Sequence, residues 1–362
     1  MKIASELIKK DIEVYFITDE RFFNYKTLFE GKEFFNSPKF KIISTPVQSF
    51  SQSKSIFHFV HKLICSFVKV AFSFCKIKPN VVVGFGGYAS FIPLLIAVLS
   101  FKKIIIHEQN IVLGKVNKIF AKFAKTILLS FPETSQIPKK LYKKIKNKIL
   151  ISGYPTFVTD VYNSNQRKAL HDLATKQEIV ILITGGSQGA NFFSIKIVNA
   201  IKSIALSFPL KTFTVYHQVR SQDIEKTLYL YSKANIPNIN INIQPIFNNI
   251  SEILYKTDIA IIRGGAGSII ENALLKVFSI IIPLPNSADN HQLQNAKTLA
   301  TNNAAVMLEE KNYKTAKLAF IISKTLQDAT FYFPIINAAS NTFNTNASDI
   351  FVNVILYNDL KF

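Results

Sequence analysis

The stretch R-G-G-A-G-S-I-I-E at residues 263–271 decides how this sequence is interpreted. The apolar run D-I-A-I-I (258–262) precedes it, and a helical pattern and a second apolar run, S-I-I-I-P (279–283), follow. Strand, glycine turn, helix and strand in this order form a βαβ unit. Glycines at such a turn let backbone N–H groups approach a phosphate, and the helix N-terminus adds partial positive charge. Glu271 would lie in the first turns of the helix, where a carboxylate can accept hydrogen bonds from sugar hydroxyls. The stretch therefore predicts a site for a nucleotide diphosphate.

The length and the net charge of the chain limit the classes of protein to which it can belong. The chain has 362 residues, 48% of them hydrophobic, which is enough for the cores of two domains of ordinary size. Its formal net charge is +20, from 43 Lys and Arg against 23 Asp and Glu. Such an excess suits acidic lipid headgroups, a phosphorylated substrate or a nucleic acid. The absence of zinc-finger spacing and of an RNA-recognition motif disfavours nucleic acid. A merely solvated basic surface and an anionic membrane surface as partner both stay open.

The cysteine content and the N-terminus predict a reduced, cytoplasmic protein. Only Cys65 and Cys75 occur, and neither belongs to a C-x-x-C pair. The N-terminus reads as a mixed-charge helix over residues 1–10, without a secretory signal. Residues 81–101 carry no charge, as in a transmembrane helix, but they contain glycines and Pro93. We expect a buried strand, a glycine loop and a buried helix there instead.

Strands alternate with helices along both halves of the chain, which predicts an α/β protein with parallel sheets covered on both faces. Gly153-Tyr154-Pro155 marks the boundary between the halves. We expect an N-terminal domain at 1–155, a C-terminal domain at 156–330 and terminal helices at 331–362. The strands are expected at 12–17, 40–44, 81–84, 103–106, 126–129, 148–152, 178–184, 211–217, 240–244, 258–262, 279–283 and 304–308.

A long helix is expected at residues 56–78, with an apolar face that is wider than one stripe. His58, His61, Lys62 and Lys69 interrupt that face. The pattern fits a core helix. It also fits an apolar and basic patch that dips into the surface of a bilayer.

Three further loops are expected at the carboxyl ends of strands, where ligands of parallel sheets bind. They are G-F-G-G-Y-A-S (84–90), H-E-Q-N (107–110) and G-G-S-Q-G-A (185–190). Ser187 could offer its hydroxyl and backbone N–H to a phosphate, although tight turns without a ligand would have the same glycines. His107 could simply satisfy local backbone groups. No motif for a metal site or a nucleophile occurs.

Taken in order, GFGGY, HEQN, GGSQGA, RGGAGSIIE and NHQ-x-x-NA resemble the motifs of MurG. This is the family of bacterial undecaprenyldiphospho-muramoylpentapeptide β-N-acetylglucosaminyltransferases. The resemblance covers residues 1–326. HEQN and GGSQGA together are specific to the family, whereas RGGAGS alone indicates only the wider group of two-domain nucleotide-sugar transferases. The resemblance implies the GT-B fold, in which two Rossmann-like parallel-sheet domains face a cleft.

The resemblance also implies an activity. The family transfers N-acetylglucosamine from UDP-N-acetylglucosamine to lipid I, giving lipid II for peptidoglycan synthesis, with inversion and without a metal or other cofactor. It works as a peripheral protein at the cytoplasmic face of the inner membrane. By this resemblance Glu271 would hold the ribose hydroxyls, the backbone near Phe247 would face uracil, and Gln292 would bind the transferred sugar. The residues that would contact the donor are Asn110, Ser187, Phe247, Ala266, Gly267, Ser268, Glu271 and Gln292. Gly86, Gly87 and Tyr88 would border the acceptor diphosphate.

Two departures from the family's pattern bear on activity. The pattern begins with a strand and a G-G-T-G-G-H loop, which carries acceptor contacts and the His proposed as base, whereas this sequence opens on the next helix. Either the start lies upstream of Met1 or the copy is truncated, and its N-terminal sheet would then lose paired backbone groups. His107 and Glu108 are the remaining candidates for the base. Phe157 stands where the family often has a donor-binding Arg, which predicts weaker donor binding.

Two other functions therefore stay open beside the lipid I transferase. One is a non-catalytic protein that still binds a UDP-sugar. The other is a GT-B transferase for a different lipid-linked acceptor.

Overall fold

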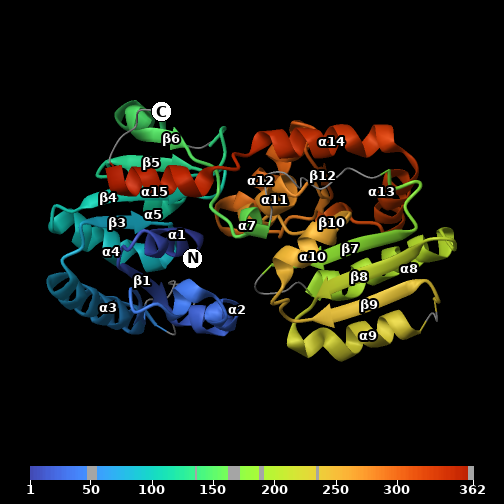
Figure 1. Cartoon of the computed structure of the whole chain (residues 1–362), viewed down its shortest axis with the longest axis horizontal. Helices are drawn as coiled ribbons and strands as arrows, with labels where there is room; N and C mark the ends of the chain where they lie inside the picture. Colours follow the sequence, from blue (N-terminus) through green and yellow to red (C-terminus); the bar gives the residue numbers. More distant parts are fainter. Residues whose placement is uncertain (47–54, 135–136, 162–171, 187–190, 234–235, 358–362) are drawn as a thin grey trace. The chain divides into compact units, whose positions relative to one another are not determined.

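The computed structural model describes residues 1–46, 55–134, 137–161, 172–186, 191–233 and 236–357. The chain divides into two compact units: residues 1–155 together with 346–362, and residues 156–345 (Figure 1). Each unit has parallel sheets covered by helices, which is the α/β class expected from the alternation of apolar runs and helical patterns.

The second unit is built on one six-stranded parallel sheet with the strand order β12-β11-β10-β7-β8-β9. Its central strands carry unbroken runs of Ile, Val and Leu because both faces of the sheet are buried under helices. The strands are β7 (Glu178–Thr184), β8 (Thr212–Gln218), β9 (Ile239–Gln244), β10 (Ile259–Ile262), β11 (Phe278–Ile281) and β12 (Val306–Met307). The helices are α7 (Val158–Val161), α8 (Val198–Ser207), α9 (Ile224–Ser232), α10 (Ile250–Lys256), α11 (Ala266–Leu274), α12 (His291–Thr301), α13 (Thr315–Gln327) and α14 (Ala329–Thr342).

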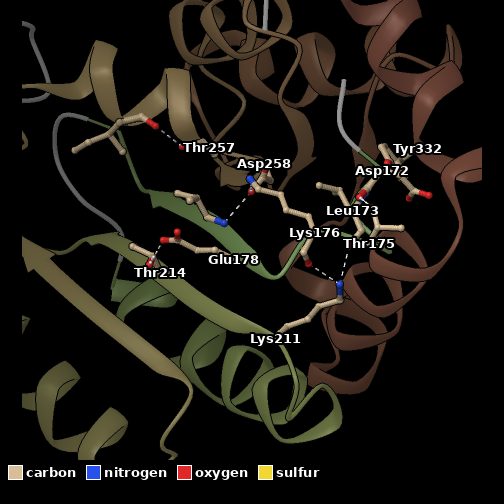
Figure 2. Close-up of polar contacts among 12 residues, drawn as sticks. Asp172, Leu173, Thr175, Lys176, Glu178, Lys211, Thr214, Thr257, Asp258 and Tyr332 are labelled. Atoms are coloured by element: carbon tan, nitrogen blue, oxygen red, sulfur yellow. Dashed lines mark hydrogen bonds and ion pairs between the residues drawn. The ribbon is translucent and has the colours of Figure 1, made fainter. Parts of the chain in front are cut away.

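Polar contacts anchor the amino ends of two of these strands (Figure 2). The Asp258 carboxylate accepts hydrogen bonds from the Val180 N–H at 2.9 Å and from the Lys176 ammonium at 2.6 Å. The Lys211 ammonium donates to the carbonyl oxygens of Leu173, Ala174 and Lys176, so it caps the segment that leads into β7. These contacts lie at the amino ends of the strands, whereas the glycine turns follow the carboxyl ends.

The first unit holds two separate parallel sheets, the pair β1-β2 and the four strands β3-β4-β5-β6. The strands are β1 (Val14–Asp19), β2 (Phe40–Thr45), β3 (Val81–Gly84), β4 (Lys103–Glu108), β5 (Thr126–Leu129) and β6 (Ile149–Ile151). The helices are α1 (Lys2–Lys9), α2 (Thr27–Glu30), α3 (Ile56–Ile77), α4 (Gly87–Leu99), α5 (Lys115–Phe120), α6 (Lys139–Ile145) and α15 (Ala347–Tyr357). In the described part of the chain, neither β1 nor β3 has a strand partner on its second edge. The parallel sheet of this unit is thus interrupted between β1 and β3 in the described residues.

The two sheets of this unit share the same two layers of helices. Ile17 of β1 and Val82 of β3 belong to the core under α3, α4 and α5, while Val14 and Val81 belong to the core under α1 and α15. Both sheets are therefore packed as parts of one layered unit, although no hydrogen bonds join them in the described residues.

The C-terminal helices do not form a segment of their own, as residues 331–362 were expected to do. Helix α14 packs against α11 and α13 in the second unit, whereas α15 packs against α1 in the first (Figure 1, red). The reason is hydrophobic: Phe351, Val352 and Val354 on α15 are buried against strand residues of the first unit.

One loop boundary was also wrong. His107 and Glu108 of H-E-Q-N belong to strand β4 rather than to the loop after it. Polar residues after an apolar run resemble the end of a strand. Here they continue the strand, where His107 Nε2 lies within hydrogen-bond distance of Ser130 and the Glu108 carboxylate accepts a hydrogen bond from Asn117.

Candidate functional site

The two glycine turns of the second unit follow neighbouring strands, β7 and β10. Strand order reverses between these two strands, because β8 and β9 extend the sheet on one side and β11 and β12 on the other. In open α/β sheets, ligands bind beyond the carboxyl ends of the strands at such a switch point. Gly186, in the first turn, has φ +77°, a conformation that favours glycine. Ser187 lies outside the described residues.

The second glycine turn is held from the side by helix α12. The Gln292 side-chain oxygen accepts hydrogen bonds from the N–H groups of Gly264 at 3.2 Å and Leu284 at 3.1 Å. The Asn295 amide donates to the Gly264 carbonyl at 3.0 Å. A Cβ on Gly264 would lie 2.3 Å from the Gln292 carbonyl oxygen, so only glycine fits between the turn and the helix. The motif N-H-Q-L-Q-N-A thus shapes the turn that precedes it by some thirty residues in the sequence, roughly the length of one βαβ unit.

Helix α11 begins directly after Gly265, which leaves its first N–H groups pointing out of the helix end. These groups belong to Ala266, Gly267 and Ser268, three of the residues expected to contact the donor. Together with the positive end of the helix dipole they make a candidate anion site at the switch point.

Arg263 points away from this anion site into the protein. Its guanidinium donates to the Ile282 carbonyl at 3.0 Å, pairs with Glu310 at 2.5 Å and lies 4.6 Å from the centre of the Phe193 ring. Burial lowers the pKa of Arg263, and the Glu310 carboxylate opposes that shift. The Arg263 charge is therefore paired with Glu310 inside the unit. The positive potential at the turn comes from the backbone N–H groups of α11 instead.

Glu271 lies further along α11 and receives a hydrogen bond from a residue at the start of the unit. The Thr156 hydroxyl donates to its Oε1 at 2.6 Å. Burial raises the pKa of the Glu271 carboxyl, and the hydrogen bond from Thr156 lowers it. A half-buried carboxylate at the end of the anion site has the chemistry needed to accept hydrogen bonds from sugar hydroxyls.

Phe247 follows β9, and its side chain is buried edge-on against the Tyr216 ring, with 5.7 Å between ring centres. Only its backbone is therefore suited to face a ligand, which is the role that the resemblance gave it. Gln292 is half-buried, and its side-chain oxygen is occupied by the two backbone N–H groups described above.

In the first unit, Glu108 organises the loop after β4. Its carboxylate accepts hydrogen bonds from the Asn110 N–H at 3.0 Å, the Gly114 N–H at 2.8 Å and the Asn117 amide at 2.8 Å. The Asn110 amide donates to the same carboxylate at 3.3 Å. Glu108 is only 3% exposed, so these contacts fix the loop conformation and leave the carboxylate poorly placed to take a proton from a substrate.

His107, the other candidate base, is completely buried. The rings of Phe85, Tyr154 and Phe351 surround it, and its Nε2 lies 2.8 Å from the Ser130 hydroxyl. Burial lowers the pKa of His107 to about 3. A neutral, enclosed imidazole is suited to hold strands β4 and β5 together, and this geometry argues against a role as base.

The glycine loop before α4 forms a second helix N-terminus, in the first unit. Gly86 and Gly87 both have positive φ, at +74° and +72°, and Tyr88 is 48% exposed. A Cβ on Gly86 would lie 3.2 Å from the Asn117 amide nitrogen, so this loop packs on the same asparagine that contacts Glu108. Gly86, Asn117, Glu108 and the Asn110 loop are thus connected, and Gly87 and Tyr88 follow Gly86 at the start of α4.

Three residues that organise these sites were missed in the sequence. Asn117 was hidden inside a helical pattern, and Asn295 stood in a motif in which Gln292 and its neighbour His291 were considered instead. Thr156 carried no signal, since 115 residues separate it from Glu271. Among the described residues, no three His, Cys, Asp or Glu side chains gather in a group that could hold a metal ion.

The parallel sheets of the two units and the glycine turns at the switch point define a class, the GT-B glycosyltransferases. The fold is similar to the crystal structure of MurG from Acinetobacter baumannii, with a TM-score of 0.71, 23% sequence identity, and coverage of 98% of this chain and 94% of that one. It is also similar to a putative UDP-N-acetylglucosamine 2-epimerase from Listeria monocytogenes, with a TM-score of 0.62, 11% identity, and coverage of 89% and 83%.

The family follows from the sequence comparisons. Residues 1–129 match the glycosyltransferase family 28 N-terminal domain, and residues 180–350 match the glycosyltransferase family 28 C-terminal domain. The chain is 33% identical over 325 residues to the UDP-N-acetylglucosamine--N-acetylmuramyl-(pentapeptide) pyrophosphoryl-undecaprenol N-acetylglucosamine transferase of Rickettsia felis, covering 88% of this chain and 84% of that protein. It is 34% identical to the Rickettsia canadensis enzyme of the same name, with coverage of 91% and 88%. The chain belongs to this family, the MurG glycosyltransferases.

Proposed function

We propose that this protein transfers N-acetylglucosamine from UDP-N-acetylglucosamine to lipid I, an undecaprenyl-linked muramyl-pentapeptide pyrophosphate, giving lipid II. The observation that carries the proposal is the glycine turn at the switch point of the second unit, where the helix N-terminus of α11 and the carboxylate of Glu271 lie at the same end of the sheet. A diphosphate bound at the N-terminus of α11 would present its ribose toward Glu271. The names of the Rickettsia relatives supply the identity of donor and acceptor.

The geometry suits the departure of UDP. As the bond from the anomeric carbon to the diphosphate oxygen breaks, UDP takes the bonding electron pair and its negative charge grows. The N–H groups of Ala266, Gly267 and Ser268 can stabilise that charge because they are fixed in direction before the reaction. The acceptor hydroxyl forms the new bond on the opposite face of the sugar and gives its proton to a base. Neither His107 nor Glu108 is assigned that role, because both are buried and engaged with neighbouring groups.

A transfer assay tests the proposal. Purified protein is incubated with radiolabelled UDP-N-acetylglucosamine and a lipid I analogue in vesicles, and labelled lipid is separated from donor. We expect label in the lipid, and a loss of about 10- to 100-fold in Glu271→Gln, since hydrogen bonds to a charged group would be lost. The control Glu225→Gln alters an exposed carboxylate on α9 and should transfer normally. UDP-sugar binding without transfer would favour a non-catalytic UDP-sugar-binding protein. Transfer to a different lipid-linked acceptor would favour a GT-B transferase with another substrate.

We also propose that helix α3 rests on an anionic membrane surface. By length and composition, α3 is the one described helix that could cross a membrane, but one face of it packs on the core through Ser66, Val70 and Phe74. Its opposite face exposes an apolar set, here called the α3 stripe, with residues three and four apart. The stripe consists of Ile56, Phe57, Val60, Ile64, Val68 and Phe72.

The charges beside the α3 stripe support the same proposal. Lys62, Lys69 and Lys76 lie on the helix, which contains no acidic residue. Exposed apolar side chains with flanking lysines are the pattern of an interfacial helix, in which lysines contact headgroups while the apolar face enters the bilayer surface. A helix of this kind would hold the protein at the membrane, where a lipid-linked acceptor is located.

Vesicle cosedimentation tests the membrane proposal. We expect the protein to bind phosphatidylglycerol vesicles more tightly than phosphatidylcholine vesicles, and the double variant F57S/F72S to lose binding to both. Lys69→Gln with Lys76→Gln should weaken only the preference for the anionic lipid, by about 1 kcal/mol for each lysine. Leu210→Ser, at an exposed apolar residue of the second unit, is the control. Equal binding by the F57S/F72S variant and the unaltered protein would rule out this role for the stripe.

A further inference from the structure

We propose that Thr156 is a positioning residue for the nucleotide-sugar donor, because its hydroxyl orients the Glu271 carboxylate for the ribose diol. This inference rests on the proposed function, since it assumes that Glu271 faces the ribose of a bound UDP-sugar. No other described residue donates a side-chain hydrogen bond to Glu271.

The direction of the hydrogen bond follows from the partners of the Thr156 hydroxyl. That oxygen accepts a hydrogen bond from the Val158 N–H at 3.3 Å. Its single proton is therefore left to be donated, and Glu271 Oε1 lies 2.6 Å away. This is the short distance typical of an O–H group that donates to a carboxylate.

Thr156 is itself held rigidly. Its side chain is 4% exposed, and its carbonyl accepts a hydrogen bond from the Thr159 hydroxyl at 2.9 Å. Val158, two residues further on, is buried at the start of α7, and α7 packs against α10. The hydroxyl is thus fixed to the scaffold of the second unit, so the carboxylate that it contacts is restricted in rotation as well.

The protonation state of Glu271 matters for the ligand. A carboxylate offers about four acceptor positions, of which Thr156 uses one, so both hydroxyls of a ribose diol can still donate to it. A protonated carboxyl would carry a donor of its own and would lose acceptor capacity. Because burial raises the pKa of Glu271 and the Thr156 hydroxyl lowers it, this hydroxyl favours the form that a diol requires.

A titration without any ligand tests the first half of the inference. In protein labelled with carbon-13 at glutamate carboxyl groups, the Glu271 signal is assigned through its loss in Glu271→Gln, and its pKa is read from the shift with pH. We expect Thr156→Val to raise this pKa, because the hydrogen bond that lowers it is lost. Thr156→Ser, which keeps the hydroxyl, should stay close to the unaltered protein. Thr212→Val removes a hydroxyl from an exposed residue of β8 and should have no effect. An unchanged pKa in Thr156→Val would refute the inference; Thr156→Ala serves if the valine variant does not fold.

Binding of UDP and of 2′,3′-dideoxy-UDP tests the second half. Calorimetry at pH 6 and pH 8 should show that the unaltered protein prefers UDP by on the order of tenfold or more. Thr156→Val should lose most of this preference, and lose more of it at pH 6, where its Glu271 is more protonated. Thr156→Ser should restore the preference. If the unaltered protein bound both nucleotides equally, or if the valine variant kept the full preference at both pH values, the positioning role would be refuted even with normal sugar transfer. If the binding preferences come out as expected but no sugar is transferred, only the proposed reaction would be refuted.

Discussion

At Gly264 the polypeptide of the glycine turn approaches helix α12 so closely that no side chain can be accommodated. We expect Gly264→Ala to push α12 away, because the new Cβ would lie 2.3 Å from a backbone oxygen of Gln292 that cannot move alone. The variant should unfold at a lower temperature and bind UDP weakly, with a cost on the order of 1–3 kcal/mol. Thermal unfolding and calorimetry measure the two effects.

Gly265 provides the matched control for thermal unfolding. A Cβ there would meet nothing within 4 Å, and its φ of −70° is accessible to any residue. Gly265→Ala should therefore unfold like the unaltered protein. Equal unfolding temperatures for the Gly264 and Gly265 variants would contradict the close approach described here.

His107 should make the first unit sensitive to acid. Its pKa is about 3 in the folded protein against 6.5 for the free side chain, so between these values the unfolded chain binds a proton that the folded chain does not. Stability is then complete above about pH 6.5 and falls as the pH drops toward 3, with a loss of about 2 kcal/mol at pH 5. Denaturant titrations at pH 7 and pH 5, followed by a probe in the first unit, should show this loss, and His107→Gln should remove it. Burial also lowers the pKa of His217 to about 3, but His217 lies in the second unit.

His61→Gln, at an exposed histidine of α3, supplies the comparison outside the core. Retention of the full acid sensitivity in His107→Gln would show that other groups cause it.

Single residues differed in how far the sequence revealed their roles. The glycine turn and the place of Glu271 on the helix after it were predictable, because a tight turn and a helix N-terminus require particular residues at particular spacings. His107 and Glu108 were recognised as polar residues after a strand, but their burial was not, because it depends on Ser130 and Asn117 from other elements. The partnership of Thr156 with Glu271 exists only in the folded unit.

At the scale of elements, Lys211 is expected to stabilise the start of β7. Its ammonium donates to three carbonyl groups of the segment 173–176 at 2.7–2.9 Å (Figure 2). Lys211→Met would leave those carbonyls without their cationic donor, at a cost of about 1–3 kcal/mol. Urea unfolding measures the loss. Lys226→Met, at an exposed lysine of α9, should change nothing, and an equally small effect at Lys211 would argue against the cap.

The strands were predictable as elements because buried parallel strands carry continuous apolar runs. The expected and observed ends agree within one or two residues for β7 and β8, for example. Agreement was poorer where polar residues continue a strand, as in β4, because the local sequence does not show which side chains find partners. For α3, the sequence allowed a core helix or an exposed patch, and the structure shows a helix with one buried and one exposed apolar face.

At the scale of the whole molecule, α15 links the end of the chain to the core of the first unit. Phe351 is completely buried and contacts the rings of Phe85 and His107. Phe351→Ala should destabilise the first unit by about 3–5 kcal/mol, because it removes a large side chain from a packed core. Hydrogen exchange should speed up in α1, β4 and β5 and stay unchanged in the second unit.

Tyr357 lies on the same helix but is exposed, so Tyr357→Ala is the control. Faster exchange throughout residues 156–345 in the Phe351 variant would contradict the division into units given above.

The order of strands and the division of the chain near Pro155 correspond to features of the sequence, namely alternating patterns and a Gly-Tyr-Pro turn. The assignment of α15 to the first unit could not be predicted, because any apolar helix can pack on any complementary surface. What decides it is the shape of the core between α1, β4 and β5, which forms only on folding.

The interrupted sheet of the first unit has a consequence for handling the protein. Strands β1 and β3 each present an edge that pairs with no other described strand, and such edges are templates for pairing with another chain. Concentrated solutions should therefore self-associate through these edges, and the apparent molar mass from light scattering should rise with protein concentration. A short synthetic peptide with alternating apolar residues, added in excess, would compete for the edges and lower the scattering.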